Sequence, residues 1–100
     1  MSSAFARHWR SVPPDVIAWR EWDGELVVRN ERSGSSHLLG PLAGRVLQVL
    51  LEADAALSVE AIAFRLNDPP VAPADPELCA AIDMALSEFR RLELALPVVP

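Results

Sequence analysis

The sequence contains no lysine and only one cysteine, Cys79. A single cysteine can form neither an intramolecular disulfide nor a structural zinc site by itself, so nothing in the chain indicates an oxidising compartment. Nine arginines stand against fourteen acidic residues, and the formal net charge is −5. The basic surface that attracts nucleic-acid phosphates is therefore missing, which argues against nucleic acid as a partner.

Long hydrophobic runs are missing as well. Even the apolar stretch from Val46 to Leu51 is interrupted by Gln48, and a membrane-spanning helix needs about 18 consecutive apolar residues. Arg7 and Arg10 break up the segment in which a signal peptide would have its apolar core. We therefore expect a cytoplasmic protein without a membrane partner.

Length and composition favour one small globular domain. A chain of 100 residues has room for one modest core, and 51% hydrophobic residues are enough to build it. Residues 1–15 include Trp9 and the pair Pro13-Pro14, which disfavours regular structure, so we expect an extended arm over the core. The domain itself is expected at 16–96.

Sequence patterns typical of β-strands and tight turns extend from residue 16 to about residue 40. Asp23-Gly24 is a strong two-residue hairpin signal of type I′, which needs a positive φ at both residues. A second turn is expected at Arg32-Ser33-Gly34, and Gly40-Pro41 ends the last strand because proline cannot continue a ladder. The expected strands are Val16–Trp22, Glu25–Asn30 and Ser35–Leu39.

Helical spacing of apolar residues follows from Pro41 onward. The first helix has proline in its first turn, the second has Ser58 as N-cap, and the third begins at Asp75-Pro76-Glu77 after a proline-rich loop at 67–74. The buried face of the third helix is expected to comprise Leu78, Ile82, Ala85, Leu86, Phe89 and Leu92. The sequence thus predicts an α+β, winged-helix-like fold in which a three-stranded antiparallel sheet precedes three helices (β-β-β-α-α-α).

Candidates for catalysis are few. His8 and His37 are the only histidines, and neither has a partner at catalytic spacing. Cys79, in the first turn of the third helix, is interpreted as a small buried hydrophobe. The sequence shows no metal-ligand constellation and no phosphate-binding glycine loop, so we expect no catalytic residues, no metal, no cofactor and no enzymatic activity.

Two tryptophans in the first strand need separate interpretations. Trp19 and Trp22 are an odd number of residues apart, so they point to opposite faces of the sheet. In one interpretation Trp19 packs inward and the N-terminal arm shields Trp22. In the other, one of them belongs to an interaction surface.

Two motifs and their order carry a family resemblance. Trp22-Asp23-Gly24-Glu25, the later Ser35-Ser36-His37-Leu38-Leu39 and the Pro41-Leu42-Ala43 helix start resemble the PqqD-like proteins over residues 16–94. Within that group the chain looks most like the PqqD-type member of the HPr-rel-A system, a bacterial cluster that also contains a kinase-like enzyme.

PqqD-like domains, also called RiPP recognition elements, are peptide chaperones that hold the leader of a precursor peptide and present it to a modifying enzyme. The resemblance implies that the peptide adds as a strand to the third strand and lies between it and the third helix. The implied peptide-binding residues are Ser35, Ser36, His37, Leu38, Leu39, Ile82, Leu86 and Phe89.

Two other functions remain open at this point. A winged-helix DNA-binding regulator has similar elements, although its recognition helix would need basic residues and the second helix here offers only Arg65. A non-catalytic subunit that regulates a kinase-like enzyme fits the same fold. The sequence leaves open the peptide, the modification reaction, the choice between monomer and homodimer, and whether the N-terminal arm covers the binding edge.

Overall fold

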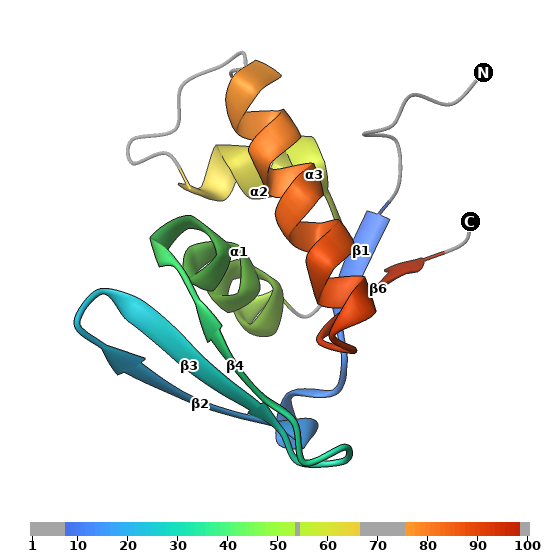
Figure 1. Ribbon diagram of the computed structural model, residues 1–100. Coiled ribbons are helices and arrows are strands. Elements are labelled where there is room, and N and C mark those ends of the chain that lie inside the picture. Colours follow the sequence, from blue (N-terminus) through green and yellow to red (C-terminus); the bar gives the residue numbers. More distant parts are fainter. Residues whose placement is uncertain (1–7, 54, 67–75, 99–100) are drawn as a thin grey trace.

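The α+β, winged-helix-like architecture expected from the sequence is confirmed, with an additional small sheet (Figure 1). The computed structural model describes residues 8–53, 55–66 and 76–98. The elements are β1 (His8–Ser11), a 3-10 turn (Pro14–Val16), β2 (Ile17–Trp22), β3 (Glu25–Asn30), β4 (Ser36–Leu39), α1 (Pro41–Glu52), β5 (Leu57–Ser58), α2 (Val59–Leu66), α3 (Pro76–Arg91) and β6 (Ala95–Val98). The expected loop at 67–74 and Asp75 lie outside the described residues.

The expected meander forms an antiparallel sheet in the order β2-β3-β4. Trp22 pairs with Glu25, and Asp23 and Gly24 have φ values of 53° and 81°. The two-residue turn with positive φ at both positions is therefore confirmed. The first and third strands each begin one residue later than predicted.

Asn30 links the second turn of this sheet to the end of α3. Its side chain is 3% exposed, and its Oδ1 accepts hydrogen bonds from the backbone N–H groups of Arg32 (2.9 Å) and Ser33 (3.1 Å). Its Nδ2 donates to the carbonyl oxygen of Glu93 at 3.0 Å. One buried amide thus fixes the position of the β3–β4 turn relative to the C-terminus of α3.

The helix ends follow local rules. Pro41 is the first residue of α1, and Ser58 Oγ caps α2 by accepting a hydrogen bond from the N–H of Ala61 at 3.1 Å. In α1, a Cβ added to Gly44 would lie 3.1 Å from Leu26 Cβ, so glycine permits close packing of this helix on β3.

A left-handed residue ends α3. Glu93 has φ 63°, its N–H donates to the carbonyl of Arg90 (3.2 Å), and the N–H of Leu94 donates to the carbonyl of Phe89 (2.8 Å). This is the Schellman arrangement, with glutamate at the position that usually holds glycine. It turns the chain directly from α3 into β6.

The second sheet, in the order β5-β1-β6, was not predicted. The expectation that the N-terminal arm lacks regular structure is wrong for residues 8–11, because β1 pairs with β5 on one side and with β6 on the other. Trp9 pairs with Leu57 and Pro97 and is buried in the core. Residues 1–7 of the expected arm lie outside the described residues.

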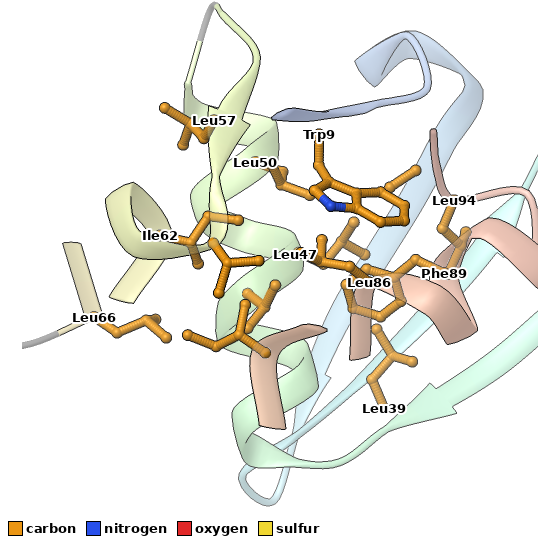
Figure 2. Close-up of a cluster of buried hydrophobic side chains, with 14 of the residues drawn as sticks. Trp9, Leu39, Leu47, Leu50, Leu57, Ile62, Leu66, Leu86, Phe89 and Leu94 are labelled. Carbon is orange, nitrogen blue, oxygen red and sulfur yellow. The ribbon is translucent and has the colours of Figure 1, made fainter. Parts of the chain in front are cut away.

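One core joins the helices to both sheets (Figure 2). Helix α1 contacts β1 in one sheet and β3 and β4 in the other, while α3 contacts β6 and both other helices. The largest fully buried side chains are Phe89, Leu47, Leu50, Ile62, Ile82, Leu86, Leu94, Val28, Val46 and Val59. Among the described helices, none has the length and apolarity needed to cross a bilayer.

Candidate functional site

The two sheets end in four edge strands within the described part of the chain: β2 and β4 in one, β5 and β6 in the other. An edge strand presents unpaired backbone N–H and C=O groups to which another chain can pair. How each edge is protected therefore indicates where such pairing can occur.

The free edge of β4 can be assigned residue by residue. The N–H of Asn30 donates to the carbonyl of Ser35 at 2.9 Å, and His37 pairs with Val28. Because backbone bonds in an antiparallel pair involve alternate residues, Ser35, His37 and Leu39 direct their N–H and C=O groups toward β3. Ser36 and Leu38 direct theirs away from the sheet.

The other edges are better protected. The N–H of Val12 donates to the carbonyl of Leu94 (3.1 Å), so the backbone of Pro97 faces outward, where proline has no N–H to offer. Strand β5 has two residues, and β2 carries the charged pair Arg20-Glu21 in its second half. Strand β4 has no arginine, carboxylate or proline.

Side chains of β4 alternate between the two faces. Leu39 is buried in the core and His37 is half-buried on the same inner face, opposite Val28. Leu38 points to the outer face and is 64% exposed. Ser36 and the preceding Ser35 are exposed.

The predicted helix residues lie deeper than the strand residues. Ile82, Leu86 and Phe89 have no exposed surface and belong to the core. In this conformation they form the support behind the helix surface and cannot contact a ligand directly. Their binding role stays a prediction.

A neighbouring flank of α3 carries the exposed residue Glu88. The pKa of Glu88 is lowered, first by its hydrogen bond from Arg91 Nε (3.1 Å), with a further electrostatic contribution from His37. His37 of β4 thus acts electrostatically on the flank of α3 that carries Glu88. Ala81 and Ala85, both half-buried, lie on this flank at helical spacing from Glu88.

Two buried nitrogens, His37 Nε2 and Trp9 Nε1, have no hydrogen-bond partner within the described part of the chain. A buried polar atom without a partner costs about 1–3 kcal/mol. His37, on the inner face of edge strand β4, thus has one ring nitrogen whose hydrogen-bonding capacity is unused.

The tryptophans are arranged differently from the first interpretation. Trp22 is 68% exposed, so the prediction that the N-terminal arm shields it is wrong. The described part of that arm pairs with β5 and β6 instead. Trp19 is on the inner face, opposite Val28, but stays 50% exposed because it lies on the outermost strand.

Features that would indicate catalysis are sparse. His8 is exposed, Cys79 is buried as predicted, and the described residues contain no group of three or more His, Cys, Asp or Glu side chains suited to a metal ion. One hollow of about 50 Å³ lies between the β2–β3 turn and α1, and another of about 520 Å³ lies between β1 and the end of α1. Neither is lined by β4.

The fold has a solved counterpart. TbiB1, solved in complex with the TbiA(beta) leader peptide, superposes with a TM-score of 0.67 over 91% of this chain and 99% of its own, at 16% sequence identity. No family model and no curated protein matches the sequence. The likeness shows that this chain shares the fold of TbiB1.

Proposed function

We propose that this protein is a peptide-binding module that takes up an extended peptide as an added strand on β4. The observation that carries the proposal is the free edge of β4, which has no arginine, carboxylate or proline and exposes Leu38. Pairing with such an edge gives affinity through backbone hydrogen bonds and specificity through alternate side chains. The likeness to TbiB1, whose structure contains a leader peptide, supports a peptide as the partner.

The peptide pairs with the outward N–H and C=O groups of Ser36 and Leu38. Every second peptide side chain then points to the inner side, past His37 and toward Ala81 and Ala85 on α3. The small size of these two alanines leaves room for a peptide side chain beside the helix. Ser35 and Leu39 bound the edge, and the buried residues Ile82, Leu86 and Phe89 hold α3 in place behind it.

In this proposal the protein itself catalyses nothing. It holds the leader of a precursor peptide for a separate modifying enzyme. We propose a kinase-like enzyme for this role, because the sequence motifs resemble the PqqD-type member of the HPr-rel-A system.

Leu38→Pro tests the edge. Proline removes the outward N–H of residue 38 and leaves the bonds between β3 and β4 in place, because those come from residues 35, 37 and 39. The probes are synthetic peptides encoded by short reading frames beside this gene, measured by fluorescence anisotropy. We expect the Kd of a binding peptide to rise at least about tenfold in Leu38→Pro, since one backbone bond and the fit of the strand are lost.

The matched control is Glu21→Pro, which removes an outward N–H from the free edge of β2. This variant should bind the peptide as the parent does, and circular dichroism should show both variants folded. Equal binding by Leu38→Pro and the parent, or a loss confined to Glu21→Pro, contradicts the proposal.

Amide NMR locates the site independently. Chemical-shift changes on peptide addition should concentrate at residues 35–39 and on the flank of α3 that includes Ala81, Ala85 and Glu88. Ala81→Glu, at a half-buried position, tests the helix side without removing a core residue. Shifts centred on α2, with β4 unaffected, would overturn the assignment.

A further inference from the structure

An apolar band crosses the outer face of the β2-β3-β4 sheet, away from the helices. It comprises Trp22, Val27 and Leu38, and we call it the outer band. Val27 lies directly opposite Leu38, and Trp22 is the diagonal neighbour of Val27 because Trp22 pairs with Glu25. Val27 is 39% exposed, less than its two neighbours.

The outer band runs from the β2–β3 turn to the free edge of β4. Leu38 is the last member of the row among the described residues, because β4 is the outermost strand of the sheet on this side. A strand added to β4 would put a side chain directly opposite Leu38. The band therefore continues across the edge only when a peptide is bound.

We propose that Leu38 is a specificity-determining residue that selects peptides with an apolar side chain at the outward-facing position opposite it. The proposal rests on strand addition at β4 and deepens it, because the bound strand is then selected on both of its faces. The inner face is selected beside His37 and α3, and the outer face by the outer band. The preferred peptide is an extended segment with an apolar residue at that outward position.

The distribution of charged side chains on the outer face favours an apolar peptide side chain opposite Leu38. The side chain in line with Leu38 and Val27 on the far strand is Arg20, which is three strands away from the added strand. Arg29, opposite Ser36, is paired with Glu31 at 3.7 Å. A charged peptide side chain opposite Leu38 would lose part of its hydration against a leucine without gaining a partner, whereas an apolar one would cover exposed surface.

The test uses a phage-displayed library of random linear 12-residue peptides, selected in parallel on the parent, Leu38→Arg and Leu38→Pro. The matched control is Phe64→Arg, which makes the same kind of change at an exposed aromatic residue on α2. Parent and Phe64→Arg should enrich peptides with an apolar residue at one outward position. Leu38→Arg should replace that residue with Asp or Glu and keep the other preferences.

A double-mutant cycle gives the size of the effect. Replacing the selected apolar residue of one enriched peptide by alanine should weaken binding to the parent roughly two- to fivefold. The same replacement should have little effect on binding to Leu38→Ala.

Failure of the inference and failure of the proposed function are distinguishable. If Leu38→Arg enriches the same residues as the parent at every position while Leu38→Pro loses binding, strand addition stands and the selection by Leu38 is refuted. If Leu38→Pro enriches the same peptides as the parent, or the parent enriches none, both are refuted.

Discussion

Removing the side chain of Asn30 should destabilise the protein far more than its place beside a turn suggests. Asn30→Ala eliminates three hydrogen bonds, two accepted from the N–H groups of Arg32 and Ser33 and one donated to the carbonyl of Glu93. A hydrogen bond contributes about 0.5–1.5 kcal/mol net, and a buried group left without a partner costs more. Together, the three lost hydrogen bonds should lower the free energy of unfolding by about 2–4 kcal/mol.

Such a loss is a large part of the about 5–15 kcal/mol that stabilises a small domain, and it corresponds to a fall in Tm of about 10–25 °C. Urea denaturation followed by circular dichroism measures it directly. The control is Ser33→Ala, which removes one exposed hydrogen bond of the same turn, from the N–H of Ser35 to Ser33 Oγ. We expect Ser33→Ala to lower the free energy of unfolding by less than about 0.5 kcal/mol.

A functional effect should accompany the loss of stability. Asn30 is the direct link between the turn that precedes β4 and the end of α3, so its removal should also weaken peptide binding at temperatures where the variant is folded. If Asn30→Ala and Ser33→Ala are equally stable, the Asn30 amide does not stabilise the fold as argued.

Three further changes test the turns and the helix surface. Gly24→Val should lower the free energy of unfolding by about 1 kcal/mol or more, because residue 24 has φ 81°, which a β-branched residue adopts only with strain. The space around residue 24 is open, so the cost is purely conformational. Coinciding thermal melts of variant and parent would contradict this. Glu93→Gly should raise the urea midpoint by the equivalent of up to about 1 kcal/mol, since glycine adopts the left-handed conformation without strain; a lower midpoint would refute it. Arg91→Ala should raise the pKa of Glu88 toward its ordinary value, which carboxyl NMR titration measures. In the parent, the lowered pKa stabilises the folded state at higher pH, and this contribution is lost as the pH falls through the pKa of Glu88 in the folded state. The variant should lack this pH-dependent contribution. An unchanged pKa would show that the Arg91 hydrogen bond does not cause the shift.

Most elements of the fold could be predicted because their signals are local. The Asp23-Gly24 turn, the Ser58 cap and the proline at the start of α1 each act within a few residues, and the structure confirms all three. Apolar spacing likewise identified the buried face of α3, including Ile82 and Phe89.

The second sheet could not be predicted in this way. Its strands β1, β5 and β6 have two to four residues each, and residues 8, 58 and 98 meet in one row although they are far apart in sequence. A two-residue strand such as β5 has no period of its own. The proline pair after β1 also favours irregular structure, and tertiary pairing overrides that preference.

The candidate site likewise has features that are encoded locally in the sequence and features that depend on tertiary packing. The sequence by itself determined that a short strand without arginine or carboxylates ends at Gly40-Pro41 and that the last helix is long and amphipathic. Both are encoded locally, in turn chemistry and hydrophobic periodicity. Only the tertiary structure decided that Ser36 and Leu38 present their backbone to the free edge, that Leu86 is fully buried in the core, and that Asn30 connects to Glu93. These depend on strand register and on the rotation of α3 about its axis, which are set by packing between segments distant in the chain.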